Sequence, residues 1–310
     1  MAKIEIAHRP ESLTGASGVG RVYLLLTLVV LFWGGNFIAA KFAVPHIPPF
    51  TITAARFTIT SLCLLLLVRL SRGPQQSFHL SDLPLFAVLG ATGYVFSTGL
   101  FYTGMRVASA TEAAIILATN PAITVVLAAI ILRERLTLRK IGGLVLAFAG
   151  AALVATGSKG LEISADHTLA DLILIAGGAS FSLYSVLGKF AMRRYSPLAA
   201  TAYSVVAGTV LLIPISIVEG GWGPALAAPA DAWIAIVYMA IFSSVVAGVA
   251  WYHGIQRIGA SRTALFNNGV PVAVMFLAAI ILHEAITLDR VIGVTLVISG
   301  ILLANMGARR

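Results

Sequence analysis

The sequence predicts an all-α integral membrane protein of ten transmembrane helices, arranged as two inverted five-helix repeats with both termini in the cytoplasm. Hydrophobic residues make up 59% of the chain and charged residues only 11%, and the mean hydropathy is +0.96. Such a composition excludes a soluble globular domain. A segment that occurs twice and an uneven distribution of basic residues together predict the inverted arrangement.

The chain contains an internal repeat. The segment Pro121 to Gly143 shares a proline, the run Ala-Ala-Ile-Ile-Leu, a glutamate, Thr-Leu and a glycine with the segment Pro271 to Gly293, always 150 positions later. A looser match relates Lys41-Phe42-Ala43 to Lys189-Phe190-Ala191 at an offset of 148. Repeats of this kind in membrane proteins place two alternating gates around one central site.

Ten apolar runs approach the length of about 20 residues that a helix needs to cross the hydrocarbon layer. They divide the chain into a cytoplasmic segment (1–21), a first five-helix repeat (22–156), a linker loop (157–167) and a second, inverted repeat (168–307). The first run is long and lacks a small-residue cleavage site, so we expect a retained span. The runs are 22–42, 50–70, 83–105, 111–132, 139–156, 168–190, 197–218, 232–256, 262–282 and 289–307.

Basic residues set the orientation of these spans. The chain has 21 Lys and Arg residues and a net charge of +9. With the N-terminus in the cytoplasm, 16 of the 21 fall on the cytoplasmic face, in agreement with the positive-inside rule. The charge is therefore a topological signal, and no nucleic-acid partner is expected. Because five spans is an odd number, the second half enters the membrane upside down, and a pseudo-two-fold axis in the membrane plane relates the halves.

Several short motifs occur in a fixed order along the first half: Trp33-Gly34-Gly35-Asn36-Phe37, Pro48-Pro49-Phe50, Ala55-Arg56-Phe57, Tyr102-Thr103-Gly104 and the segment Pro121 to Glu134. This ordered set resembles the EamA-type ten-helix exporters of the drug/metabolite transporter superfamily, most of all the YddG-type amino-acid exporters. The resemblance covers nearly the full chain. It implies a central cavity lined by the first, third, fourth, sixth, eighth and ninth spans, with the fifth and tenth peripheral. It also implies export across a bacterial inner membrane.

Polar and aromatic residues within the spans are the candidates for a substrate site, because polar groups in hydrocarbon should face a cavity or a neighbouring helix. Trp33, Asn36 and Ala40 share one face of the first span. Repeat partners in the sixth and eighth spans combine rings, hydroxyls and glycines in the same way; simple helix packing is the alternative reading. The predicted substrate-binding residues are Trp33, Asn36, Tyr94, Thr98, Phe101, Thr119, Asn120, Phe181, Tyr184, Ser244, Trp251, Asn267 and Asn268.

Pro121 and Pro271 are repeat partners near the middle of the fourth and ninth spans. A proline within a helix lacks an N–H donor and clashes with the carbonyl four residues earlier, here that of Leu117 or Asn267. The freed carbonyls must face protein or water. The sequence therefore predicts symmetric kinks that act as gate hinges or supply substrate ligands, with an inert bend as the alternative.

Two charged residues are candidate charge partners. Arg56 lies within the second span, where an arginine needs a partner or water; it is predicted to bond backbone carbonyls or, alternatively, a substrate carboxylate. Glu112 begins the fourth span, either as a first-turn acid favoured by the helix dipole or as a proton-coupling group. Glu134 and Glu284 are expected to cap or brace hairpins, and Lys41 and Lys189 to extend to the interface.

We therefore expect a secondary transporter, inserted in the lipid bilayer, that exports small metabolites by alternating access. Amino acids, aromatic or hydrophobic ones among them, are the expected substrates, and sugar-phosphate or nucleotide-sugar exchange is the alternative. The sequence lacks a P-loop and a His-Glu-x-x-His motif, so neither ATP hydrolysis nor an enzyme is expected. The single cysteine, Cys63, leaves no disulfide or thiolate metal site, and no cofactor is expected. A monomer or weak homodimer is expected.

Overall fold

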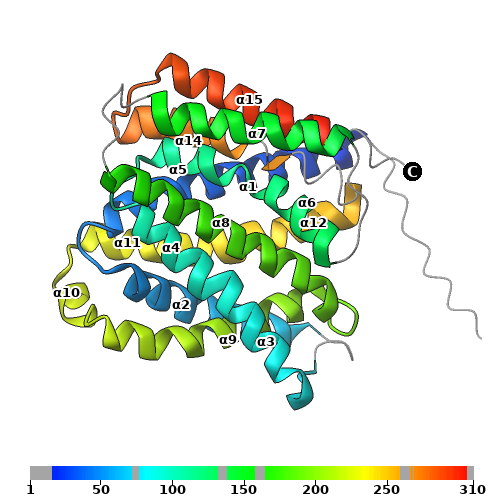
Figure 1. Ribbon diagram of the computed structural model, residues 1–310. Coiled ribbons are helices and arrows are strands. Elements are labelled where there is room, and N and C mark those ends of the chain that lie inside the picture. The colour runs from blue at the N-terminus through cyan, green and yellow to red at the C-terminus, as the bar shows by residue number, and fades with distance from the viewer. Residues whose placement is uncertain are drawn as a thin grey trace, which may run out of the picture.

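The protein is a bundle of roughly parallel and antiparallel helices, seen here in a computed structural model (Figure 1). The structure describes residues 16–71, 77–131, 138–157, 165–258, 266–267 and 269–305. All regular secondary structure in these residues is helical. Described helical residues occupy most of each of the ten predicted apolar runs.

Two helices of the first half begin with a residue suited to that position. Pro49 opens one helix in the first turn, where its missing N–H is not needed. Ser109 caps another by accepting from the backbone N–H of Glu112. The elements are α1 (Ala16–Ala43), α2 (Pro49–Leu70), η2 (Leu80–Asp82), α3 (Leu83–Gly90), the π-helical η3 (Ala91–Phe96), α4 (Ser97–Gly104), α5 (Ala110–Leu117), α6 (Asn120–Ile131) and α7 (Leu138–Gly157).

The second half follows the same order. Ser196 caps one of its helices by accepting from the backbone N–H of Ala199, and Pro197 follows in the first turn. The elements are α8 (Ala165–Ala191), α9 (Pro197–Val218), α10 (Trp222–Ala227), α11 (Ala230–Tyr238), the π-helical η4 (Met239–Val246), α12 (Ala247–Ile258), α14 (Val270–Ile281) and α15 (Leu288–Asn305).

Six helical segments among the described residues are long and apolar enough to cross a membrane. Two shorter apolar helices, Ile141–Leu153 within α7 and Val270–Ile281, add to them. The fourth predicted span is divided into α5 and α6, which shortens each piece. The six long segments are Gly20–Ala43, Pro49–Leu70, Leu80–Gly104, Asp166–Ala191, Pro197–Val218 and Ala230–Trp251.

Helices that are repeat partners pack against each other in antiparallel pairs. In α7 and α15, a Cβ built on Gly150 would lie 2.7 Å from the carbonyl oxygen of Gly293, and one built on Gly300 would lie 2.5 Å from that of Gly143. These four glycines are two repeat pairs at offset 150, and the contacts run in opposite chain directions. Glycine allows this close backbone approach, as is common between membrane helices.

The pair α2 and α9 shows the same relation. Ser61 and Thr209, partners at offset 148, join hydroxyls at 3.0 Å, while Thr51 near the start of α2 bonds Glu219 just after the end of α9. The two pairs lie on opposite sides of the bundle, at the top and bottom of Figure 1.

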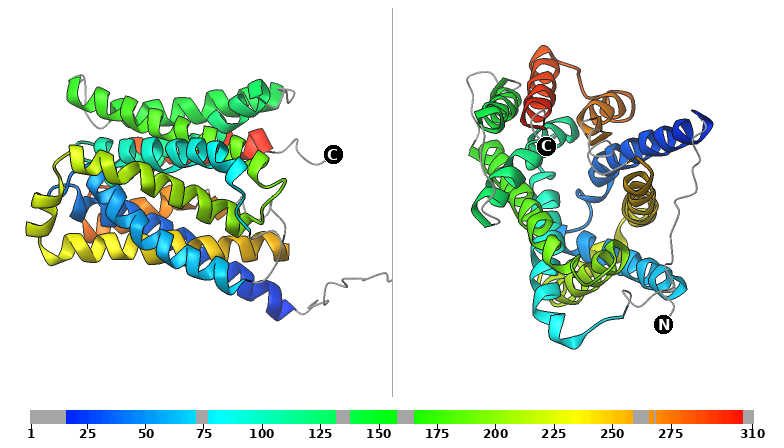
Figure 2. Two further views of the ribbon diagram at one scale, coloured as in Figure 1. Left: turned by 90° about the horizontal axis from the view of Figure 1, so that it is seen from below. Right: turned by 90° about the vertical axis from the view of Figure 1, so that its right-hand side faces the viewer.

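The first residues of α1 and the last residues of α15 lie at the same end of the bundle (Figures 1 and 2). We call this the terminal end, and the end that holds α10 and the α1–α2 turn the opposite end. In the right-hand view of Figure 2, which looks from the terminal end, α1 and α8 lie between the α7–α15 and α2–α9 pairs.

The two π-helical segments occupy equivalent places in the repeats. Ala91 and Phe96 bound η3, and their partners at offset 150, Ile241 and Val246, lie inside η4. A π-helix lengthens the backbone hydrogen bond to five residues and often marks a functional site. Both segments fall near the middle of a predicted span, the third and the eighth.

Candidate functional site

Arg56 is buried between the two halves and bonds hydroxyl groups. Its Nη1 donates to the Tyr102 hydroxyl at 2.8 Å, and its Nη2 and Nε donate to Ser244 Oγ at 2.9 and 3.3 Å. The guanidinium also lies 5.1 Å from the ring centre of Phe57. The predicted pairing with backbone carbonyls is therefore wrong, because two hydroxyls serve as the acceptors.

Trp33 of α1 contacts η4, the π-helical segment that contains Ser244. Its Nε1 donates to the carbonyl oxygen of Ser243 at 3.1 Å, and its ring lies 4.8 Å from that of Trp251, centre to centre. Tyr238, at the end of α11, donates to the carbonyl of Phe32 at 3.2 Å. Two residues predicted from separate spans, Trp33 and Trp251, are thus brought together beside η4.

The other π-helical segment makes equivalent contacts with α8. Tyr94 and Tyr184 join hydroxyls at 3.0 Å, and their rings are 5.4 Å apart. Ser180 Oγ donates to the carbonyl of Thr92 at 2.8 Å. Each π-helix therefore has a backbone carbonyl that accepts from the first helix of the opposite half, and the structure pairs two further predicted residues, Tyr94 and Tyr184.

Two predicted asparagines hold buried oxygen atoms that accept no hydrogen bond from the described residues. They are Asn36 Oδ1 in α1 and Asn120 Oδ1 at the start of α6. Asn120 lies against Gly178 of α8, and its backbone carbonyl accepts from Ser182 Oγ at 3.0 Å. A buried acceptor without a partner is unfavourable, which makes both oxygens candidates for contacts with a bound solute or water.

The two predicted proline kinks are helix starts in the structure. α5 ends at Leu117 and α6 begins at Asn120, so Pro121 is the second residue of a new helix. Pro271 is likewise the second residue of α14. The turns before them match: the N–H of Thr119 donates to the carbonyl of Ile116, and Gly269 donates to Phe266 in the same way 150 residues later. A proline at this position removes no helical hydrogen bond, so the expected clash inside a helix is wrong and a break in the span is present instead.

Other predicted residues lie outside this polar cluster. Phe101 is buried in the apolar core against Phe37, with ring centres 5.3 Å apart. Thr119 is buried and donates to the carbonyl of Ile116 within its own turn. Thr98 is half-buried, whereas Phe181 and Asn267 are exposed. Asn268 lies outside the described residues, as does Glu134.

A cluster of charged groups joins the halves at the opposite end. Glu284, in the turn before α15, accepts from the backbone N–H groups of Ala110 and Thr111 at the start of α5, at 2.8 and 3.3 Å. Arg290 bonds Glu284 at 3.2 Å and Ser109 Oγ at 3.1 Å. Glu284 therefore caps a helix of the other half, and helix N-termini favour such negative charge.

Lys41 and Glu112 complete this cluster. Lys41 Nζ donates to the carbonyls of Met105 and Ala108 in the α4–α5 turn, so the expectation that it extends to the interface is wrong. Glu112 is buried at the first turn of α5, where its side chain accepts from the backbone N–H of Ser109 in a capping box. The predicted first-turn position of this acid is the observed one.

A second carboxylate joins the halves at the same end. Glu219, after α9, accepts from the backbone N–H groups of Phe50 and Thr51 at 3.1 and 2.8 Å and from the Thr51 hydroxyl at 2.8 Å. This carboxylate caps the start of α2 from the other half, as Glu284 caps α5. Two caps that cross between the halves therefore join them at the opposite end.

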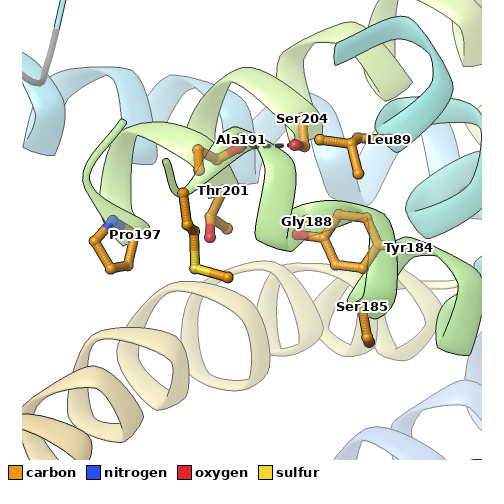
Figure 3. A pocket seen from close by; sticks show the side chains of 10 residues that line it. Leu89, Tyr184, Ser185, Gly188, Ala191, Pro197, Thr201 and Ser204 are labelled. Atoms are coloured by element: carbon orange, nitrogen blue, oxygen red, sulfur yellow. Dashed lines mark hydrogen bonds between the residues drawn. The ribbon is translucent and has the colours of Figure 1, made fainter. Parts of the chain in front are cut away.

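The terminal end holds a pocket instead. It has a volume of about 130 Å³ and lies between α3, α8 and α9 (Figure 3). Tyr184, Ser185 and Gly188 line it from α8, and a Cβ built on Gly188 would meet no atom within 4 Å. By contrast, its repeat partner Ala40 at the opposite end is fully buried. The pocket reaches the Tyr94–Tyr184 pair from the terminal side.

The terminal end also has a contact between the halves, at the start of α3. The Tyr195 hydroxyl donates to Asp82 at 2.6 Å, and Arg194 bonds the same carboxylate at 3.0 Å. Burial and the hydrogen bond to Asp82 raise the pKa of Tyr195 above its usual value. This contact fixes the α8–α9 turn to the start of α3.

The sequence did not indicate Tyr102, Ser243, Phe57 or Ser180, whose contacts hold the cluster. Tyr102 and Phe57 occur in the motifs that carry the family resemblance but not among the predicted site residues, and hydroxyl and ring residues of this kind are common in membrane helices. The one available signal was the repeat itself, since η3 and η4 fall at equivalent positions. Among the described residues, no group of three or more His, Cys, Asp or Glu side chains is placed to bind a metal ion.

One family profile matches both halves of the chain, and a solved structure shares the fold. The sequence profile of the EamA-like transporter family matches residues 20–156 and again residues 168–306. A solved structure titled only "Crystal structure of protein" shares the fold, with a TM-score of 0.65, 22% identity, and coverage of 94% of this chain and 98% of that chain.

Several curated relatives align over nearly their whole length. The uncharacterized transporter YyaM of Bacillus subtilis (strain 168) is 35% identical, over 92% of this chain and 93% of its own. A transporter of Archaeoglobus fulgidus is 31% identical, over 92% and 97%. A probable terminal-alkyne amino-acid exporter of Streptantibioticus cattleyicolor is 28% identical, over 92% and 94%.

Proposed function

The chain belongs to the EamA-like transporter family, and from this premise we propose that it is a ten-span secondary transporter of the bacterial inner membrane that exports amino acids by alternating access. It is a multi-pass membrane protein and a transporter, not an enzyme. The proposal adds the number of spans, the orientation, the substrate class and the mechanism.

The proposed topology rests on antiparallel packing of repeat partners. α7 lies antiparallel to α15, and α2 to α9. Two halves related by an axis in the membrane plane produce this pairing. The shared position of the ends of α1 and α15 supports an even number of crossings, and the positive-inside rule assigns the terminal end to the cytoplasm.

The observation that carries the transport proposal is the polar cluster at the π-helices. Aromatic rings of Trp33 and Trp251, the Arg56 guanidinium, and the buried oxygen atoms of Asn36 and Asn120, which accept no hydrogen bond from the described residues, lie in largely apolar spans. Binding sites for small molecules combine apolar walls with a few polar groups in this way. Rings of this size suit an apolar or aromatic side chain.

An amino acid is the proposed substrate because it carries groups that match the cluster. Its ammonium group donates to amide oxygens such as Asn36 Oδ1 and interacts favourably with an aromatic face. The relative of Streptantibioticus cattleyicolor named as a probable amino-acid exporter supports the same class. Sugar phosphates, the alternative substrates, carry about two negative charges. The single positive charge of Arg56 neutralises only one of them, which favours an amino acid.

The difference between the two ends of the bundle supports the proposed direction of transport, export from the cytoplasm. The caps formed by Glu284 and Glu219 close the opposite end, assigned here to the outside, whereas the pocket beside Gly188 lies at the terminal, cytoplasmic end. A solute would enter this conformation from the cytoplasm.

The breaks before Pro121 and Pro271 are the proposed hinges. Pro121→Ala and Pro271→Ala should slow transport without preventing insertion into the membrane. Unchanged transport kinetics in both variants would contradict the hinge role.

Reconstitution into liposomes tests the proposal. The purified protein is assayed for uptake of radiolabelled amino acids and of sugar phosphates, with and without a pH gradient. Saturable flux of amino acids is the expected result, and dependence on the gradient would reveal proton coupling. Exchange of sugar phosphates without any amino-acid flux would overturn the substrate class.

A further inference from the structure

Arg56 is a buried cation that pairs with no carboxylate in the described part of the chain. Its residue surface is only 8% exposed. Its hydrogen-bond partners are the hydroxyls of Tyr102 and Ser244, and among the described residues it forms no ion pair with a carboxylate, in contrast to Arg194 with Asp82 and Arg290 with Glu284. An ionised arginine inside a span is unfavourable unless an opposite charge or water compensates it, and such residues mark substrate pathways. The observed hydroxyl partners supply neither.

The hydroxyls hold the guanidinium in place and leave part of it free. A guanidinium has five N–H groups, and the three bonds to Tyr102 and Ser244 use three of them. The remaining two have no acceptor among the described residues. Tyr102 and Ser244 in turn donate to the sulfur and the carbonyl of Met239, at 3.3 and 3.0 Å. Both hydroxyls are therefore oriented as acceptors toward Arg56 and do not neutralise it.

The repeat shows that packing does not require a charge at this position. The partner of Arg56 at offset 148 is Ser204, in the equivalent turn of α9. Ser204 is buried and donates to the carbonyl of Ala200, one turn earlier in its own helix. A small neutral side chain thus occupies the equivalent place in the repeat, where it lines the pocket beside α8, so the architecture alone does not explain the arginine.

A pair of indole rings is linked to Arg56 through η4. Ser244, which holds Arg56, follows Ser243, whose carbonyl accepts from Trp33. Trp33 in turn packs on Trp251. Two successive residues of η4 therefore link a guanidinium and a pair of indole rings to one helical segment, a combination that fits a carboxylate attached to an apolar or aromatic group.

We propose that Arg56 binds the carboxylate of the transported solute, and that the Trp33–Trp251 pair contacts its apolar part. The two free N–H groups bond the carboxylate, whose charge compensates the buried cation. This inference rests on the proposed transport function, but it assigns a specificity: solutes with a carboxylate bind, and the same solutes without one do not.

Binding to the purified protein tests this inference with four probes: phenylalanine, 3-phenylpropionate, phenylalaninamide and phenethylamine. The first two carry a carboxylate and the last two do not. The unaltered protein should bind the first two at least about tenfold more tightly, which is the loss expected when a charge-assisted hydrogen bond is missing. Equal affinity for all four probes would overturn the inference without any variant.

Substitution separates recognition from folding. Arg56→Met should weaken binding of both carboxylates at least about tenfold and leave the amine and the amide unaffected, whereas Arg56→Lys, which keeps the charge but loses the fork, should give a smaller loss confined to the carboxylates. Arg69→Met, which removes an exposed cation near the end of the same helix, is the matched control and should change nothing. An equal loss for all four probes would assign Arg56 a structural role and refute the proposal.

The two proposals fail in different ways. If 3-phenylpropionate binds through Arg56 but liposomes take up no amino acid, the substrate class of the proposed function is wrong and the carboxylate site stands. If amino acids are transported equally well by Arg56→Met, transport stands and the carboxylate site is wrong.

Discussion

Replacing Glu284 by glutamine should open the closed end of the transporter. The carboxylate accepts from the N–H groups of Ala110 and Thr111 at 2.8 and 3.3 Å and from Arg290 at 3.2 Å. Hydrogen bonds to a charged group contribute about 1.5–3 kcal/mol each. Glutamine keeps one acceptor oxygen but loses the charge, so we estimate that closure weakens by about 2 kcal/mol, or about 30-fold in the ratio of open to closed protein.

Labelling of a buried cysteine measures this change. Ala40 is fully buried next to Lys41, so Ala40→Cys, made in a Cys63→Ser background, should react with a membrane-impermeant maleimide only when the opposite end opens. Glu284→Gln should raise the labelling rate in right-side-out vesicles by about the same 30-fold. Asp231→Asn is the control, because this exposed acid at the same end bonds the adjacent backbone N–H. An unchanged rate in Glu284→Gln would refute the closing role of the cap.

Three further predictions concern packing and the polar cluster. Gly150→Ala should lower the unfolding temperature of the purified protein, since its Cβ would press on a backbone oxygen at 2.7 Å, whereas Gly142→Ala, whose Cβ would meet only a side chain at 3.7 Å, should not. Trp33→Phe removes the donor to η4 and should lower the transport rate severalfold in liposomes, as expected for the loss of about 1 kcal/mol; an unchanged rate would argue against this contact. Tyr94 and Tyr184 share one hydrogen bond, so the effects of Tyr94→Phe and Tyr184→Phe on transport should be less than additive. Strictly additive effects would contradict this coupling.

The helices could be located from the sequence because hydrocarbon imposes a strong length requirement on apolar runs. The boundaries of α2 and α9 were predicted within one residue, since Pro49 and Pro197 mark their starts. The break in the fourth span was predicted at Pro121 but in the wrong form. A proline identifies where regular helix bonding stops, and only the structure shows whether the chain bends or starts a new helix.

The site was predictable only in part because membrane packing uses the same residue types as binding. Trp33 and Trp251 were both selected and they meet, whereas Phe101, chosen on the same grounds, packs into the core. Trp33 also packs against the core that contains Phe101, so residue type alone does not separate the two. The partners of Arg56 and Lys41 were likewise unpredictable, because they come from turns and helices that the sequence alone does not bring together.

The contact between α7 and α15 has a consequence for how such a protein would switch. Gly150 contacts Gly293 just as Gly300 contacts Gly143. The α7–α15 contact is therefore symmetric: the rotation that interchanges the two halves maps it onto itself. If the two halves exchange conformations, this symmetric contact is preserved. It then contributes the same free energy to both states of the transporter. Any difference in free energy between the two states must then arise elsewhere, in contacts present at one end only, such as that of Glu219 with the start of α2.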